Sequence, residues 1–183
     1  MGLDMYVYCN SKRICKEMND SDEWGQYKAK NGIAIQWRKA NAIHRWFVDN
    51  VQAEQDNCAV YEVDLQDLRK LRDTCQKVLD STKLVDARIA NGQTFKDGKL
   101  VENMVDGKKL EDPTMAQELL PTTEGFFFGS TDYDQWYWAD LEYTVRAIDR
   151  MLEHVVESRE YSWRVIHEDE PDWYVKFYYT SSW

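Results

Sequence analysis

The chain has 183 residues, of which 43% are hydrophobic and 14% aromatic, so it is long and apolar enough to fold around a core. Its formal net charge of −10 argues against direct binding along a nucleic-acid backbone, because such binding requires clustered lysine and arginine. There is no apolar run of about eighteen residues and no secretory signal pattern, so we expect a cytoplasmic protein without a membrane partner.

The four cysteines and three histidines limit the redox and metal chemistry. The cysteines form no Cys-x-x-Cys pair, which favours free thiols in a reducing compartment over disulfides or zinc. Cys9 and Cys58 alternate with their neighbours as strand residues do, and we expect both thiols to be buried. Three histidines are too few for a rich metal site, so the sequence predicts neither a metal nor a cofactor.

The charge is distributed unevenly along the chain. Residues 1–50 contain eight basic and six acidic side chains, whereas residues 131–183 contain five basic and twelve acidic side chains. This uneven distribution of charge fits a basic pocket within an acidic exterior, or an acidic face for a basic partner. Equally, the excess of acid fits a protein that merely stays soluble.

The first fifty residues predict two strands and a helix. Residues 3–9 alternate between apolar and polar side chains, which indicates a half-buried strand. Residues 10–31 are polar and irregular and are predicted as loop. Residues 32–37 form a second strand that leads directly into a helix capped by Asn41. The apolar face of that helix consists of Ile43, Trp46, Phe47 and Val51.

The middle of the chain predicts a strand, a helix and an inserted flap. Residues 59–63 form the strand, and Asp64 caps the helix. The apolar stripe of this helix is Leu65, Leu68, Leu71, Cys75, Val78 and Leu79. Between residues 81 and 113 the periodicity weakens and two hairpin signals occur, Asp97-Gly98 and Asp106-Gly107. They predict a small three-stranded β-meander, inserted as an exposed flap.

The last third of the chain predicts the longest helix, placed between strands. Residues 125–129 form an apolar run bounded by glycines, which is typical of a buried strand. Residues 130–132 then cap a helix over about 132–156. Its buried stripe is Tyr137, Leu141, Val145, Ile148, Leu152 and Val155. Two aromatic strands follow, at 161–166 and 173–179.

These elements mix without a regular βαβ alternation. We therefore expect a single α+β domain over residues 1–183, with a mixed, mostly antiparallel sheet packed with about three helices. The flap over residues 81–113 is an insertion within that domain.

Common nucleotide-binding, protease and hydrolase motifs are absent, so the candidate chemistry depends on two clusters. The first lies where the second strand meets its helix, whose unpaired N–H groups and dipole favour an anion. Arg38, Lys39 and Asn41 can bind phosphate or carboxylate oxygens. Trp37 can stack on a base, and His44 can bind the ligand or act as general acid or base. The alternative is solvated charges, a surface histidine and a core tryptophan.

The second cluster spans residues 125–138, again a strand that leads into a helix. Asp132 and Asp134 can complement cationic groups, or they simply occupy the first turn, where the helix dipole favours acids. Ser130 can contact the same ligand, although a helix cap is its simpler role. Residues 136–138 are Trp-Tyr-Trp and cannot all face one side of a helix. At least one of them therefore lies at the surface, in a pocket or in an interface.

Several blocks along the chain form a pattern of their own. They are Gly2–Tyr6, Trp37–Asn41, Ile43-His44, Trp46–Val48, Leu119–Thr122, Gly125–Gly129 and Tyr178–Trp183. In these blocks the chain resembles a family of small uncharacterised phage and prophage proteins. The resemblance implies a phage or mobile-element accessory protein in a bacterial host cytoplasm, and it assigns no catalytic residue.

The leading hypothesis is a non-enzymatic binder that sequesters a small phosphorylated, nucleotide-like ligand and so counteracts host defence. Arg38, Lys39 and His44 would hold the phosphate. Trp37 would stack on the base together with Tyr6 or Tyr133.

Two alternatives remain open. The acidic C-terminal region, with Glu168, Asp169 and Glu170, would suit an inhibitor of a basic host protein. A small hydrolase would cleave a phosphoester or glycosidic bond, using His44 with a nearby carboxylate of residue 132 or 134. A homo-oligomer is compatible with each of these functions.

Overall fold

A computed structural model describes residues 2–96, 98–125, 128–161 and 175–183, with side chains to residue 155 in the last helix. The protein has an α+β fold with a four-stranded antiparallel sheet in the order β2-β1-β6-β3. The strands are β1 (Asp4–Cys9), β2 (Ile33–Arg38), β3 (Tyr61–Val63) and β6 (Phe177–Ser182). Within these described ranges, no helix is both long and apolar enough to cross a lipid bilayer. The predicted fold class and mostly antiparallel sheet are confirmed.

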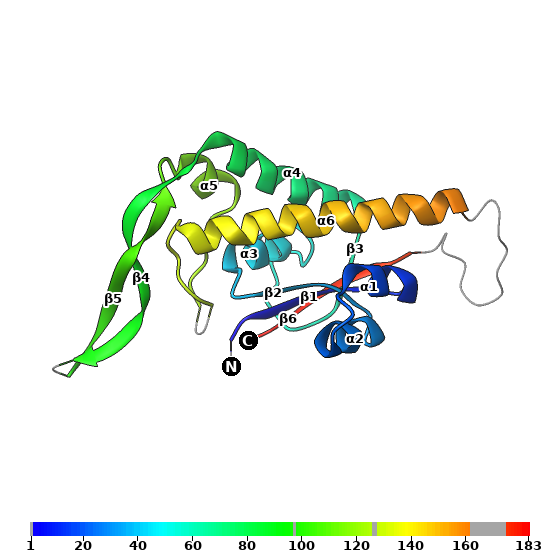
Figure 1. Cartoon of the computed structure of the whole chain (residues 1–183), viewed down its shortest axis with the longest axis horizontal. Coiled ribbons are helices and arrows are strands. Elements are labelled where there is room, and N and C mark those ends of the chain that lie inside the picture. Colours follow the sequence, from blue (N-terminus) through cyan, green and yellow to red (C-terminus); the bar gives the residue numbers. More distant parts are fainter. Residues whose placement is uncertain (1, 97, 126–127, 162–174) are drawn as a thin grey trace.

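The sheet forms around β1 because its side chains alternate strictly between two environments. Leu3, Met5, Val7 and Cys9 point into the core and are buried. β1 has β2 on one side and β6 on the other, and β6 in turn lies between β1 and β3. The pairing of β1 with β6 runs from Asp4 opposite Ser182 to Cys9 opposite Phe177. Both ends of the described chain therefore lie side by side at the sheet (Figure 1).

Within the described residues six helices surround the sheet, more than the three or so predicted from the sequence. They are α1 (Lys12–Met18), α2 (Glu23–Lys30), α3 (Asn41–Asn50), α4 (Leu65–Ser81), α5 (Thr114–Leu119) and α6 (Gln135–Tyr161). The long helices α4 and α6 run alongside each other above the sheet, and α3 lies beneath α6 (Figure 1). The Arg72 guanidinium joins α4 to α6 by donating to both carboxylate oxygens of Asp149, at 2.8 and 3.2 Å.

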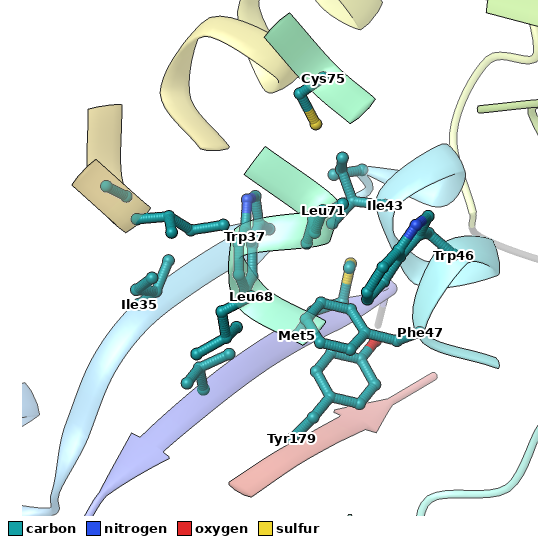
Figure 2. Packing of buried hydrophobic residues seen from close by; sticks show 14 of the residues in the cluster. Met5, Ile35, Trp37, Ile43, Trp46, Phe47, Leu68, Leu71, Cys75 and Tyr179 are labelled. Carbon is teal, nitrogen blue, oxygen red and sulfur yellow. The ribbon is translucent and has the colours of Figure 1, made fainter. Parts of the chain in front are cut away.

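The core is rich in aromatic side chains (Figure 2). Phe47 of α3 stacks on Tyr179 of β6 with ring centroids 3.8 Å apart and an interplanar angle of 8°. Trp37 of β2 packs edge-on against Phe47, and its indole N–H donates to the Thr144 hydroxyl of α6 at 2.9 Å. Burying each such ring contributes about 1.5–3 kcal/mol, so these rings anchor α3 and α6 to the sheet.

The prediction of a loop over residues 10–31 is wrong, because two short helices form there. Ser11 caps α1 by accepting the backbone N–H of Ile14 at 3.3 Å, and Asp22 caps α2 by accepting that of Gly25 at 2.6 Å. Only Ile14 and Cys15 of α1 are buried. A stripe this short gives no helical period that sequence reasoning can detect.

The predicted three-stranded meander is a two-stranded hairpin instead. β4 (Leu84–Lys96) and β5 (Lys99–Leu110) pair antiparallel and project from the body as a long arm (Figure 1). Asp106-Gly107 lies inside β5, where Asp106 accepts a hydrogen bond from the Arg88 guanidinium of β4 at 2.8 Å. A bulge between Ala90 and residue 93 interrupts the pairing.

The C-terminal predictions are correct for the helix and one strand. The apolar stripe of α6 is mostly buried as predicted, but Asp134 rather than residues 130–132 caps the helix. Phe128 has no strand pairing, and residues 126–127 of the predicted strand at 125–129 lie outside the described residues. The strand predicted at 161–166 also lies outside them, except that residue 161 ends α6. The strand predicted at 173–179 exists as β6, but it spans Phe177–Ser182, and residues 173–174 of the prediction lie outside the described residues.

The thiols follow the predictions only in part. All four cysteines carry free thiols, and those of Cys9, Cys15 and Cys75 are buried. Cys58 was expected to be buried, but its residue is exposed because it lies in the loop before β3 rather than in a strand.

Candidate functional site

The two clusters predicted from the sequence line one cavity of about 480 Å³. Its walls come from the turn between β2 and α3, the first residues of α3, the bulge of the hairpin arm, and the segment that leads into α6. The polar side chains on these walls include Arg38, Lys39, Asn91, Ser130, Asp132, Asp134 and Asp140. This volume lies within the range of about 300–1,000 Å³ that is usual for small-molecule sites.

One wall of the cavity is basic. Arg38 ends β2, and Lys39 follows in the left-handed region with φ of 60°. The backbone N–H of Lys39 donates to the Leu3 carbonyl at 2.7 Å, which fixes this turn against the start of β1. Gly129, with φ of 96°, lies against Lys39 so closely that an added Cβ would be 3.2 Å from the lysine Cβ. The turn and the facing loop therefore hold Lys39 at the edge of the cavity.

The N-terminus of α3 lies beside these basic side chains. Ala40 occupies the N-cap position and offers no side-chain acceptor. The backbone N–H groups of Ala42 and Ile43, which also line the cavity, lack intrahelical acceptors because they belong to the first turn. They are suitable donors for an anion, reinforced by the helix dipole.

Asn41 holds this wall in place and does not cap the helix as predicted. Its amide N–H₂ donates to the carbonyls of Phe128 at 3.3 Å and Ser130 at 2.8 Å. Its carbonyl oxygen accepts the backbone N–H of Thr123 at 3.2 Å. The side chain is thus occupied by the loop over residues 123–130, and its contribution to a ligand site is positional. Ser130 itself lines the cavity, and its hydroxyl accepts the backbone N–H of Asp132 at 3.0 Å.

The opposite wall is acidic. Asp134 is 1% exposed, and its Oδ1 accepts the backbone N–H groups of Trp136 at 2.8 Å and Tyr137 at 3.2 Å. Its Oδ2 is buried and has no hydrogen-bond partner among the described residues. Burial, and then the charge of Asp132, raise the pKa of the Asp134 carboxyl, against the two hydrogen bonds that lower it. A buried oxygen without a partner is costly, and a donor from a ligand would relieve that cost.

Asp140 lies one to two turns further along α6 and was not identified from the sequence. Burial raises its pKa to about 7, and the nearby charge of Asp134 adds to the shift. Near neutral pH the carboxyl is therefore present in both protonation states, so it can donate or accept a hydrogen bond. The spacing of the sequence could have indicated this position. Asp140 is three residues after Tyr137 and four before Thr144, both of which are buried on α6, so a helix places Asp140 next to them.

Two aromatic residues line the cavity, Trp136 and Tyr137; Tyr137 is buried, whereas Trp136 is 57% exposed. The stacking role predicted for Trp37 does not fit, because its ring is buried in the core (Figure 2). Tyr6 lies on the opposite face of β1, next to Tyr8. The ring of Tyr133 packs against Tyr137, and its hydroxyl accepts the backbone N–H of residue 122 at 3.3 Å.

His44 lies outside this cavity, contrary to its predicted role in phosphate binding. Its ring is fully buried between the Tyr179 hydroxyl, 2.8 Å from Nδ1, and the Asp56 carboxylate, 3.1 Å from Nε2. Burial lowers the pKa of His44 and Asp56 opposes the shift. A separate hollow of about 320 Å³ is lined by His44, Arg45, Val48, Asp49, Glu54, Asp56 and Thr123. The combination of His44 with Asp132 or Asp134 expected for a hydrolase is therefore not formed.

Over the described part of the chain, no three histidine, cysteine or carboxylate side chains are placed to hold a metal ion. The chain matches no protein-family model, no curated protein and no solved structure. What the cavity does must accordingly be argued from its own chemistry.

Proposed function

We propose that this chain is a phage or mobile-element accessory protein that binds and sequesters a small phosphorylated, nucleotide-like ligand. The observation that carries the proposal is the cavity of about 480 Å³, in which a basic wall faces an acidic wall. A ligand that fills it needs an anionic end and an end that donates hydrogen bonds. A mononucleotide has both, and it is of a size that such a volume holds.

The phosphate occupies the basic wall. Arg38 and Lys39 neutralise its charge, and the N–H groups of Ala42 and Ile43 at the start of α3 donate to its oxygens. The Arg38 side chain is 67% exposed and lies 4.0 Å from Asp4, a loose ion pair that leaves the guanidinium available to a ligand. Lys39 is likewise exposed at the rim.

The base occupies the acidic wall. Asp134 has a buried oxygen that no other described residue contacts by a hydrogen bond, and Asp140 lies further along the same helix. Two carboxylates match the amino and imino N–H groups of guanine, or the amino group of adenine, better than they match uracil. Trp136 at the rim provides a face on which the base stacks.

Binding without turnover is the simpler function for this cavity. The buried imidazole of His44 lines a different hollow, so it is not available as a general acid or base here. The alternative of an acidic inhibitor of a host protein rests on residues 168–170, which lie outside the described residues. Sequestration in a bacterial cytoplasm, as a means of counteracting host defence, follows from the resemblance to phage proteins and is part of the proposal.

The test is a thermal-shift screen against mononucleotides, cyclic di- and trinucleotides, nucleotide sugars and ADP-ribose derivatives, followed by calorimetry on each hit. A ligand at a hundredfold excess over its Kd stabilises the fold by about 2.7 kcal/mol. For a chain of this length that raises Tm by roughly 5–11 °C. Chromatography of the same mixtures detects any turnover.

The matched variants are Arg38→Ala with Lys39→Ala, and Lys12→Ala with Lys16→Ala, which removes two exposed charges from α1. The first pair should weaken binding at least tenfold, because each lost charge-assisted hydrogen bond costs about 1.5–3 kcal/mol. The second pair should leave the Kd unchanged. Equal affinities for the two double variants would refute the site, and a flat screen would refute the function.

A further inference from the structure

The outer part of the hairpin arm is unusually exposed for a pair of strands. From residue 91 to the tip and back to residue 104, both faces of the described hairpin are open to solvent. Phe95 is 71% exposed and pairs directly with Leu100, which is 67% exposed. Val101 and Met104 are exposed as well. Because a lone two-stranded hairpin is only marginally stable in water, an arm of this kind calls for a surface that covers it.

The charges at the tip indicate what kind of surface that is. Lys96 and Lys99 are directly opposite each other in the ladder, and like charges in that position destabilise a hairpin. The outer arm, residues 91–104, carries these two lysines and two acidic residues, whereas the whole chain has a net charge of −10. The Lys96–Lys99 pair therefore fits acidic side chains on a surface that also offers apolar contact.

The body of the same protein carries such a surface on α2. Trp24 and Tyr27 are 53% and 52% exposed, and their rings stack on each other at 5.1 Å with an interplanar angle of 9°. The acidic residues Asp20, Asp22 and Glu23 surround the start of this helix and are exposed, whereas Lys28 and Lys30 lie in its last turn, so the acidic part of this surface is the start of α2. In Figure 1 the tip of the arm points away from α2 of its own chain, so only another molecule can bring the two together.

We propose that two copies of this chain form a dimer by exchanging arms. The Phe95–Leu100 pair of each arm packs on the Trp24–Tyr27 pair of the other copy, and Lys96 and Lys99 face the acids at the start of that α2. The arm of each copy contacts α2 of the other copy, so the same two surfaces meet twice. Such an arrangement is closed and has two-fold symmetry. The proposal is independent of what the cavity binds.

Sedimentation equilibrium of the full chain over a wide range of concentrations tests the proposal. The unmodified protein should be dimeric, with a dissociation constant that rises with added salt. The variants Phe95→Ser with Leu100→Ser, and Trp24→Ala with Tyr27→Ala, should each weaken the dimer at least tenfold. Val60→Ser, at a large apolar residue that is 64% exposed and lies before β3, should leave it unchanged.

Charge reversal is the decisive part of the experiment. Lys96→Glu with Lys99→Glu, and Asp20→Lys with Glu23→Lys, should each give a monomer, and all four changes in one chain should restore the dimer. Circular dichroism on every variant excludes loss of the fold as the cause. A monomeric unmodified protein, or a dimer indifferent to these variants, would overturn the proposal. Binding of the monomer to phosphatidylserine vesicles through the arm tip would overturn it too, in favour of a membrane surface.

Discussion

Replacing Asp140 with asparagine should make this protein more stable at neutral pH. The carboxyl has its pKa raised to about 7 from an ordinary 3.8 by burial and by the neighbouring Asp134. A shift of about three units corresponds to about 4 kcal/mol of destabilisation once the carboxyl is fully ionised. This is an upper limit, because the side chain is only partly buried by area and solvent screens its charge. Asparagine keeps the shape of the side chain and removes the charge.

The pH dependence of that effect identifies its cause. Because the pKa is higher in the folded state than in the unfolded state, the folded protein binds the extra proton between about pH 4 and pH 7. The unmodified protein therefore loses stability relative to Asp140→Asn as the pH rises through this window. The advantage of the variant should grow from pH 5 to pH 8, by at most about 2–3 kcal/mol.

Urea unfolding of both proteins at a series of pH values measures this difference. Glu142→Gln is the matched control, because Glu142 is exposed on the same helix. The reasoning is refuted if the difference between Asp140→Asn and the unmodified protein is constant with pH, or if the control reproduces it. A carboxyl kept at such a cost is typical of a functional site, where activity is retained at the expense of stability. We therefore also expect Asp140→Asn to bind the ligand more weakly although it is more stable.

Two other changes test how the cavity and the core are held. Asn41→Ala removes the three hydrogen bonds that fix the loop over residues 123–130 to α3 and should lower the free energy of unfolding by about 2–4 kcal/mol. Asn31→Ala, at an exposed amide, should change the free energy of unfolding by less than about 1 kcal/mol. If the two variants lose the same amount of stability, Asn41 does not hold the loop to α3. Tyr179→Phe leaves Nδ1 of buried His44 without its partner at 2.8 Å and should cost about 1–3 kcal/mol in urea unfolding. No loss of stability would show that His44 finds another partner.

The parts of the fold that could be predicted from the sequence are those set by local periodicity. The alternation over β1 and the apolar stripes of α4 and α6 each extend over enough residues to define a period. Asp106-Gly107 misled the prediction, because the pairing of a whole hairpin outweighs a local turn signal. Helix α1 was missed because its buried face is only one turn long.

The candidate site was predictable as two pieces but not as one cavity. Each strand-to-helix junction could be identified from its own residues, including Lys39 and Asp134. What joins them is the amide of Asn41, which binds a loop more than eighty residues away in the sequence. The sequence left a core position for Trp37 open as an alternative, but it could not decide for it, because the contact with Thr144 is distant in sequence. The inward position of His44 was not inferred at all, because it depends on the contact with Tyr179.

The position of β6 between β1 and β3 has a consequence for how the protein forms in the cell. Val7 pairs with Tyr179, so the sheet is completed by residues that leave the ribosome long after β1. Until then β1 pairs only with β2, and its other edge is open. Among the described residues β3 has no other strand to pair with, and the ring of Phe47 lacks the ring of Tyr179 on which it stacks. Contacts so distant in sequence slow folding, and an open edge strand can pair with other chains. We therefore expect nascent chains to rely on chaperones until β6 is synthesised and inserts into the sheet.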